Sequence, residues 1–518
     1  MKTFKEKLFE YYNLDETSFK NLTKELIEAD FLNICNYKNI KEISQFIKDE
    51  IANNKKILIY GDYDCDGIMS ICIMYLTLKK FGITPGFYIP FREIDGYGIN
   101  KERINFFKKL NYDTIILVDN GITLCEEVDL IHDLGMKVVI IDHHTIKEKV
   151  PNTPYILHPI VSNIGEYNAS AGALCFYLSY VMLNQVDEYL LSLGGISIIS
   201  DMMPLVNYNR TLLRHALKAI NKNKFYQIQK LVNFKNEITE NDIGMKIAPK
   251  VNAIGRIVTD NKLFNVVKFF IETDVKKIDY YADFIESTNL KRQNLVEEVS
   301  QDLKSKISED LAFIILVLDI KEGLTGLIAN KLLQIYNKPT LILTNDKDNN
   351  LKGSIRSKHG LNVFNLLEEN SSLFIAYGGH ELAGGITTSK ENLDKIKEIF
   401  NNYAKEHPFT EERIKGIDIT IDDVNETNYS IIKELSPFGQ DFNVPLFKLN
   451  NFNTNFFKFS YDKNHIITNL SFNSSLIYFS FDKEILNNKF VNLIGTIDEN
   501  VFNGKKTIQF KVKSYEKI

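Results

Sequence analysis

The sequence predicts a multidomain α/β protein with a strand-rich C-terminal domain, and three observations lead to this fold class. Short apolar runs that fit buried strands alternate with helical patterns in the first half of the chain, which is typical of a parallel sheet. The same alternation returns after one long helical pattern, and short aromatic strands follow it. A chain of 518 residues is too long for one ordinary core. The expected divisions are residues 1–50, 51–272, 273–310, 311–408, 409–436 and 437–518.

The composition is that of a globular protein. Hydrophobic residues make up 44% of the chain and charged residues 25%, and the formal net charge is -5. No apolar run approaches the ~18 residues that span a bilayer, and the first residues lack the apolar segment of a secretory signal. The five cysteines form no CxxC pair, so we expect neither a disulfide framework nor a zinc knuckle. We therefore expect a cytoplasmic monomer without membrane contact, in which any nucleic-acid surface is local.

Residues 1–50 show apolar residues at three- and four-residue spacing, which predicts amphipathic helices with a packing role. After them, ILIY at 57–60 predicts a strand buried on both faces of a parallel sheet. The following helical pattern ends at Gly82, and two further apolar strands, TIILV and KVVII, each precede another polar cluster. Strands that alternate with helices in this way predict a parallel sheet, whose ligands bind beyond the carboxyl ends of its strands.

Carboxylates and imidazoles follow three of these strands. The first cluster is Asp62, Asp64 and Asp66, the second is Asp119-Asn120-Gly121, and the third is Asp142-His143-His144. Bunched carboxylates repel one another and are costly to desolvate, and a bound cation removes both costs. The alternatives are an acidic turn that caps a helix and an Asx turn with a solvated histidine pair. Three clusters at one sheet edge favour a shared metal site.

A fourth acid, Asp201, ends the apolar run LSLGGISIIS. Such an acid is costly to bury unless it is paired or bound to a metal, although it could instead cap the next helix. Carboxylates with one or two imidazoles suit magnesium or manganese better than a structural zinc. Two such ions ~3.5–4 Å apart can activate a water and stabilise both oxygens of an in-line displacement at phosphorus.

The rest of the chain contributes three further patterns. A helical pattern from about 273 to 307 predicts a core helix or, in view of its length, a rigid connector between two lobes. In the second α/β unit, Gly378-Gly379-His380 predicts either a plain turn or a loop that lets the backbone approach a phosphate. Residues 437–518 carry ten Lys against seven Asp and Glu in short aromatic strands, with a hairpin signal at Asn503-Gly504. This pattern suits an OB-type barrel, in which most of the aromatic residues are expected to be core residues.

Together these motifs resemble the DHH phosphoesterase superfamily, and in particular the RecJ-type single-strand-specific exonucleases. The absence of a histidine shortly before Asp62 agrees with that branch. The resemblance implies two divalent cations, Mn²⁺ or Mg²⁺, with Asp119 as the bridging ligand. It implies outer roles for Asp66 and Asp142, and a place for His144 close to the scissile phosphate. For Asp66 we expect either a cap on the helix after Gly67 or support of the site from outside. The implied ligands are Asp62, Asp64, Asp119, His143 and Asp201.

The resemblance also implies DNA contacts. Arg92 precedes a glycine-rich turn where RecJ-type proteins carry a basic residue near the 5′ end of the strand, although it could be an ordinary surface arginine. The segment IAPKVNAIGRI and the second α/β unit resemble the family's phosphate-contacting segments and its DHHA1 domain. Arginine suits this role because its planar fork donates two hydrogen bonds. The implied contacts are Arg92, Asn252, Arg256, Ser354, Arg356, Gly378, Gly379 and His380.

The function that this resemblance implies is degradation of single-stranded DNA from the 5′ end, in DNA repair and recombination. A helicase and a single-strand-binding protein are the implied partners. PFGQDFNVPLF at 437–447 departs from the family's usual entry to the last domain, so the entry loop there is expected to differ. Two alternatives remain at this point. One is a phosphodiesterase for short oligoribonucleotides, cyclic dinucleotides or nucleoside bisphosphates, and the other is a non-catalytic nucleic-acid-binding scaffold.

Overall fold

The structure is a computed structural model. It describes residues 2–164, 169–304, 307–308, 310–410, 415–461, 463–502 and 505–518. The chain divides into two compact units, one formed by Met1–Ile27 with Glu412–Ile518 and the other by Glu28–Glu411. Among the described residues, no helix is both long and apolar enough to cross a membrane.

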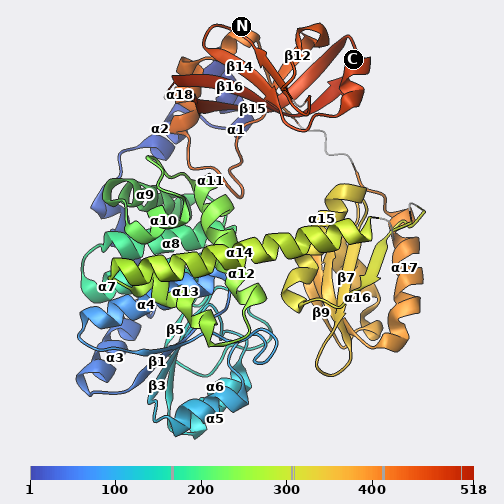
Figure 1. The fold of residues 1–518 in the computed structure, drawn as a ribbon. Coiled ribbons are helices and arrows are strands. Elements are labelled where there is room, and N and C mark those ends of the chain that lie inside the picture. Colours follow the sequence, from blue (N-terminus) through green and yellow to red (C-terminus); the bar gives the residue numbers. More distant parts are fainter. Residues whose placement is uncertain are drawn as a thin grey trace. The chain divides into compact units, whose positions relative to one another are not determined.

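The larger unit begins with a five-stranded parallel sheet in the order β2-β1-β3-β4-β5 (Figure 1). The register pairs Tyr60 with Leu117 and Val118 with Ile141, so the strands β1, β3 and β4 end at one edge. The strands are β1 (Ile57–Tyr60), β2 (Gly86–Tyr88), β3 (Thr114–Val118), β4 (Lys137–Ile141) and β5 (Ile156–Leu157).

Helices cover both faces of this sheet, which explains the uninterrupted apolar strands. Leu58 and Tyr60 pack with the α5 and α6 side chains, whereas β1 and β4 contact α4 and α7 from the other face. The helices of this part are α3 (Ile40–Ala52), α4 (Cys65–Lys80), α5 (Lys101–Lys109), α6 (Cys125–Asp133), α7 (Ala171–Leu183), α8 (Glu188–Ser200), α9 (Asn207–Asn223), α10 (Tyr226–Leu231), α11 (Glu240–Asp242), α12 (Ala248–Ile257) and α13 (Asn265–Ile271).

The predicted long helix is confirmed as α14 (Val275–Leu303). It contacts α12 and α13 of the first α/β body, and it also contacts α15 of the second (Figure 1). Leu303 lies in one apolar cluster with Ile257, Ile314 and Ile328. The helix therefore shares core contacts with both bodies of the larger unit.

The second α/β body contains a mixed sheet in the order β6-β7-β8-β10-β9, in which only β6 and β7 are parallel. Strand β9, which carries Gly378, Gly379 and His380, is the edge strand. The elements are β6 (Ile314–Val317), α15 (Thr325–Tyr336), β7 (Thr340–Asn345), β8 (Leu351–Arg356), α16 (Val363–Glu369), β9 (Ala376–His380), β10 (Ala383–Thr388) and α17 (Leu393–Glu406).

The smaller unit is built on a six-stranded mixed sheet in the order β11-β12-β15-β16-β14-β13. Strands β15 and β16 pair as far as Phe502 and Lys505, while the predicted turn residues Asn503 and Gly504 lie outside the described residues. The elements are α1 (Phe4–Tyr12), α2 (Glu16–Thr23), β11 (Ile417–Ile419), α18 (Glu426–Glu434), β12 (Phe447–Asn453), β13 (Ile466–Asn469), β14 (Ser474–Tyr478), β15 (Phe490–Phe502) and β16 (Lys505–Lys517).

Helix α1 belongs to this smaller unit, which differs from the single helical segment expected for residues 1–50. Phe4 and Leu8 are buried in the core of the smaller unit, and the Phe4 ring stacks on Phe447 with ring centroids 5.4 Å apart. The sequence pattern showed an apolar helix face but not the distant strands that cover it. Helix α3, by contrast, packs in the larger unit against α7 and β5.

Short helical turns complete the described structure. They are the 3-10 turns η1 (Glu28–Asn36), η3 (Asn261–Phe264), η4 (Glu322–Leu324), η5 (Ser371–Leu373), η6 (Lys390–Asn392), η7 (Ile421–Asp423), η8 (Thr454–Phe456) and η9 (Lys483–Asn487), and the π-helical turn η2 (Ile243–Ile247). The two α/β bodies, the long helix and the small β domain confirm the predicted fold class.

Candidate active site

The turn after β1 supplies the first acids. Asp62 is 5% exposed, and its Oδ1 accepts no hydrogen bond from any described residue. Asp64 is the N-cap of α4, where its Oδ1 accepts the Gly67 N–H at 3.0 Å. A Cβ at position 67 would lie 2.7 Å from the main chain of Asp62, so only glycine allows this turn to close. The DxDxDG pattern thus packs two carboxylates against a helix N-terminus.

Asp66 occupies a different place from the one expected. Its carboxylate accepts the N–H groups of Ala171 and Gly172 at 2.9 and 2.8 Å, and it also accepts the Ser197 hydroxyl. It therefore binds the first N–H groups of α7, whose N-cap residue is Ser170, while Asp64 caps α4, so the expected cap by Asp66 on α4 is wrong. Asp66 also belongs to a ligand-type group with His143 and Asp201, in which the three donor atoms lie within 4.8 Å of one another. This places Asp66 inside the cluster.

Asp119 stands directly after β3 in the left-handed region, with φ 61°. Aspartate tolerates this conformation better than most residues, and Gly121 follows with φ 116°. The Asn120 side chain donates to the Val118 carbonyl at 2.8 Å and closes the turn. The Asp119 side chain is 2% exposed, and its Oδ1 lies 3.3 Å from His143 Nε2.

Asp142, directly after β4, organises the histidine pair. Its Oδ1 accepts the N–H groups of His143 and His144 at 2.7 and 3.1 Å and lies 2.8 Å from His144 Nδ1, while its Oδ2 accepts the Ile122 N–H. Burial opposes its ionisation, but the His144 contacts and these N–H groups lower the pKa of Asp142 to about 2. Burial likewise lowers the pKa of the His144 imidazole, but Asp142 outweighs it and raises that pKa to about 9.

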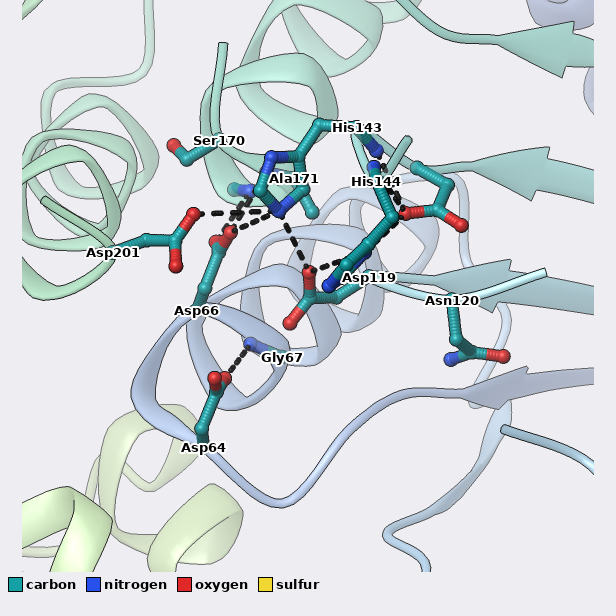
Figure 2. A network of polar contacts seen from close by, with 12 residues as sticks. Asp64, Asp66, Gly67, Asp119, Asn120, His143, His144, Ser170, Ala171 and Asp201 are labelled. Carbon is teal, nitrogen blue, oxygen red and sulfur yellow. Dashed lines mark hydrogen bonds and ion pairs between the residues drawn. The ribbon is translucent and has the colours of Figure 1, made fainter. Parts of the chain in front are cut away.

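His143 lies at the centre of the acids (Figure 2). Its Nε2 is 3.3 Å from Asp119 Oδ1, 3.3 Å from Asp201 Oδ2 and 3.7 Å from Asp66 Oδ2. Burial lowers the pKa of His143 and so favours the neutral imidazole, the form that binds metals. Asp201 is the C-cap residue of α8 and not the cap of the next helix, whose N-cap is Val206.

The cluster is electrostatically unsatisfied without a cation. Burial, followed by neighbouring carboxylates, raises the pKa of Asp62 and of Asp201 to about 8 and that of Asp119 well above its usual range. Within the described chain, Asp119 Oδ1 and Asp201 Oδ2 are also buried without a hydrogen-bond donor. Such oxygens are costly to bury unless a cation binds them. The ligand-type groups are Asp62/Asp64/Asp119, Asp66/His143/Asp201 and Asp119/His143/His144.

These groups fit two divalent cations. Asp119 and His143 each occur in two of the three groups, and of these two side chains the Asp119 carboxylate is the one with two ligand oxygens, as a bridge between two ions needs. The donors are carboxylate oxygens and imidazole nitrogens, the set that Mn²⁺ and Mg²⁺ accept, and no thiolate takes part. The residues present therefore fit the cations that the resemblance implies.

Arginines from four elements gather beside the cluster. The Arg92 guanidinium lies over the Tyr63 ring at 4.2 Å, and Arg256 Nη1 donates to the Gly323 carbonyl at 3.0 Å. Burial, followed by the charges of Arg92, Arg292 and Arg356, lowers the pKa of Arg256 to about 10. Guanidiniums that destabilise one another in this way favour an anion.

The other residues predicted to contact DNA lie in different surroundings. Asn252 Oδ1 accepts the Cys65 N–H at 2.7 Å and so braces the start of α4. Ser354 lies 3.0 Å from the Thr325 hydroxyl, beside Arg356. Gly378, Gly379 and His380 are exposed on β9. No hydrogen bond or ion pair between described residues joins His380 to the acidic cluster.

The sequence analysis missed three residues of this region. Tyr97 contacts His144 and Asp119 through its hydroxyl, and its position between two glycines was the available signal. His158 Nε2 lies 2.9 Å from the His144 carbonyl, but no sequence pattern singles it out. Arg292 lies on the polar pattern of α14, where its charge resembles those of its exposed neighbours.

Comparisons with known proteins match three parts of the chain to known domains. Residues 56–196 match the DHH family N-terminal domain, residues 310–406 the DHHA1 domain and residues 417–514 the RecJ OB domain. The chain is 29% identical over 428 residues to the single-stranded-DNA-specific exonuclease RecJ of Bacillus subtilis, covering 80% of this chain and 54% of that protein. It is 26% identical over 467 residues to the RecJ of Haemophilus influenzae, covering 82% and 80%. The chain thus spans about half the length of the Bacillus relative.

The fold matches that of a solved relative. The crystal structure of RecJ in complex with Mn²⁺ from Thermus thermophilus superimposes with a TM-score of 0.84 at 20% identity, over 99% of this chain and 75% of that chain. A parallel sheet with this acidic edge, followed by a DHHA1 domain, defines the class of DHH phosphoesterases. The match of the third domain to the RecJ OB domain and the two RecJ relatives then show that the chain is similar to the RecJ-type branch of this class. The resemblance read from the motifs is confirmed.

Proposed function

We propose that this protein is a metal-dependent exonuclease that hydrolyses single-stranded DNA from its 5′ end. The observation that carries the proposal is the convergence, at one sheet edge, of three buried carboxylate oxygens that lack donors among the described residues. They lie in overlapping ligand-type groups, and unpaired arginine charge lies beside them. The relatives are named single-stranded-DNA-specific exonucleases, which supports the choice of substrate.

The residues divide between two cations. Asp62 and Asp64 would hold one ion, Asp66, His143 and Asp201 would hold the other, and Asp119 would be the carboxylate shared between them. When bound, the two ions lower the pKa of water and neutralise charge on the reacting phosphate. Asp142 fixes the His144 ring from outside the ligand set. Asp66 is assigned here as a ligand because its carboxylate lies within the group of His143 and Asp201.

The arginine group holds the end of the strand. Arg92, Arg256 and Arg356, joined by Arg292, supply guanidiniums whose combined charge favours a terminal phosphate. Ser354 and the exposed Gly378-Gly379-His380 segment of β9 contact the backbone further along. The β domain follows the strand with its aromatic residues. Asn252 acts indirectly, since its side chain already binds the main chain of α4.

The cellular setting extends this proposal. Degradation of single strands suits DNA repair and recombination in the cytoplasm. A helicase would supply the strand there, and a single-strand-binding protein would occupy it. We propose that the protein acts as a monomer, because one chain supplies all the ligand groups.

The test is one digestion series. Single and double strands labelled at the 5′ or the 3′ end are incubated with Mn²⁺, Mg²⁺ or a chelator, and a labelled dinucleotide is run in parallel. We expect cation-dependent release of 5′ nucleotides from single strands. If only the dinucleotide is cleaved, the protein is instead a phosphodiesterase for short substrates. If single strands are bound but not cleaved, it is a non-catalytic nucleic-acid-binding scaffold.

Asp119→Asn is the sharpest variant, because asparagine also tolerates the left-handed backbone at this position. Loss of the shared carboxylate should lower kcat by at least about 10³-fold, the effect of several kcal/mol of lost transition-state stabilisation. Asp133→Asn, at an exposed end of α6, is the matched control. Cation-dependent cleavage at the wild-type rate by Asp119→Asn would contradict the assignment.

A further inference from the structure

The segment between β2 and α5 is held in one conformation by a buried acid. Asp95 is 9% exposed, and its carboxylate accepts the Tyr88 hydroxyl at 3.0 Å, the Phe91 N–H at 2.8 Å and the Arg103 Nε–H at 2.7 Å. A carboxylate with three charge-assisted hydrogen bonds fixes the backbone around it. Arg92 of the arginine group lies in the same segment.

Tyr97 is presented by this segment at a defined position. It stands between Gly96 and Gly98, which have φ values of 77° and 76° and so make a turn that other residues enter only with strain. The Gly98 carbonyl accepts the Tyr60 hydroxyl at 2.9 Å, which ties the turn to the last residue of β1. The Tyr97 ring lies edge-on to the His144 ring, with centroids 5.4 Å apart.

The Tyr97 hydroxyl joins two strand ends of the site. It donates to the Asp119 carbonyl at 3.2 Å, and it lies 3.0 Å from His144 Nδ1. A phenol has one proton, and a carbonyl can only accept a hydrogen bond, so the Tyr97 oxygen is the acceptor toward His144. A phenol is protonated at neutral pH, so the Tyr97 hydroxyl has this proton to donate.

The proton on His144 is therefore located. Nδ1–H points at both the Asp142 carboxylate, at 2.8 Å, and the Tyr97 oxygen. Nδ1 carries a proton whether the ring is neutral or charged, and Nε2 is the nitrogen left for an ion or for a phosphate oxygen. Asp142 alone would allow the ring to swing about this bond. A second partner from another segment prevents that rotation.

We propose that Tyr97 is a positioning residue, whose hydroxyl holds His144 and the left-handed turn of Asp119 in register so that His144 Nε2 faces the reacting phosphate. The inference rests on the proposed nuclease function. The segment then has two roles. Arg92, near its start, contacts the DNA strand, and Tyr97, near its end, positions the catalytic His144.

Tyr97→Phe tests this role because it removes the hydroxyl alone. We expect kcat on single-stranded DNA to fall about 10- to 100-fold, as is typical for the loss of a partner that orients a functional histidine, while KM stays within about twofold. In a His144→Gln background the same change should have no further effect on kcat, because Tyr97 acts through that ring. Tyr189→Phe, which loses a hydroxyl bond to the Phe270 carbonyl outside this segment, should keep kcat within about twofold.

A second measurement does not depend on activity. In the metal-free protein labelled with ¹⁵N-histidine, the His144 signal, identified by its loss in His144→Gln, should report a slowly exchanging proton on Nδ1. In Tyr97→Phe that proton should exchange faster. A wild-type ring that carries a proton on Nε2 but none on Nδ1, a rise in KM alone or additive effects in the double variant would overturn the inference. If the wild-type protein does not cut DNA, the proposed function fails, and the exchange of this proton still decides the role of Tyr97.

Discussion

Gly326 and Arg356 approach so closely that a Cβ at position 326 would meet Arg356 Nη2 at 2.7 Å. Gly326 lies in the first turn of α15, and Arg356 ends β8. Ser354 Oγ would lie 3.4 Å from the same Cβ. The absence of a side chain at position 326 therefore leaves the space that the Arg356 guanidinium occupies. The position of this glycine near a helix start did not predict that role.

Gly326→Ala should displace the Arg356 guanidinium. The flexible arginine side chain gives way, so we expect KM for single-stranded DNA to rise about tenfold, the loss of one charged hydrogen bond. Thermal stability should hold or rise, because alanine favours a helix over glycine by about 1 kcal/mol. Gly244→Ala is the control, since a Cβ there meets only Ile199 at an ordinary 3.5 Å. An unchanged KM in Gly326→Ala would remove Arg356 from the strand contacts.

Arg292→Gln should weaken strand binding. Arg292 Nε is buried without an acceptor among the described residues, and burial lowers the pKa of this guanidinium, so a phosphate there would satisfy it. We expect about tenfold weaker binding, and a slope of log K against log salt that is flatter by about 0.7. Binding is measured in the Asp119→Asn background to prevent cleavage. The exposed neighbour Lys291→Gln is the control, and an equal loss in both variants would argue against a specific phosphate contact.

Stability of the metal-free protein should fall as pH rises. Asp62 and Asp201 have folded pKa values of about 8 against 3.8 for the free side chain, so their contribution is complete below pH 3.8 and is lost as pH rises through about 8. His144, raised from 6.5 to about 9, loses its contribution between those two values. We expect Tm in chelator to decline from pH 6 to pH 9.

Mn²⁺ should abolish that decline, because a cation stabilises the ionised carboxylates and its affinity grows as protons leave. Asp62→Asn should make the decline shallower, while the exposed Asp133→Asn should leave it unchanged. A Tm that stays level in chelator over this range would show that the buried acids are already satisfied without metal.

Leu8→Ala should destabilise the smaller unit alone. Leu8 is 0% exposed in a core built mainly from the C-terminal strands, and its truncation should cost about 2–5 kcal/mol. Urea unfolding with limited proteolysis would locate the loss at residues 417–518, and Mn²⁺ binding by the larger unit should be unchanged. The exposed Lys20→Ala is the control. Equal stability in Leu8→Ala and Lys20→Ala would contradict the packing of α1.

Local patterns predicted most of this fold and much of the site. The apolar run 57–60 predicts a buried strand, and the three alternating acids after it predict metal ligands at the end of that strand. Both predictions succeed from the sequence because the burial of a strand and the spacing of its ligands are local properties. The role of Asp66 was not local. It depends on the start of α7, some hundred residues later in the chain, and on His143. Arg292 and Tyr97 also act through partners that only the folded chain brings to them.

Contacts between residues far apart in the sequence also shape the smaller unit. The apolar face of α1, with Phe4 and Leu8, is made before the larger unit during synthesis, while Phe447 and the strands that cover this face are made after it. The larger unit, residues 28–411, is synthesised in between. It can fold as it leaves the ribosome, whereas the smaller unit must wait until the strands of residues 412–518 have been made. The α1 face stays uncovered through that interval, so the larger unit is expected to mature before the smaller unit.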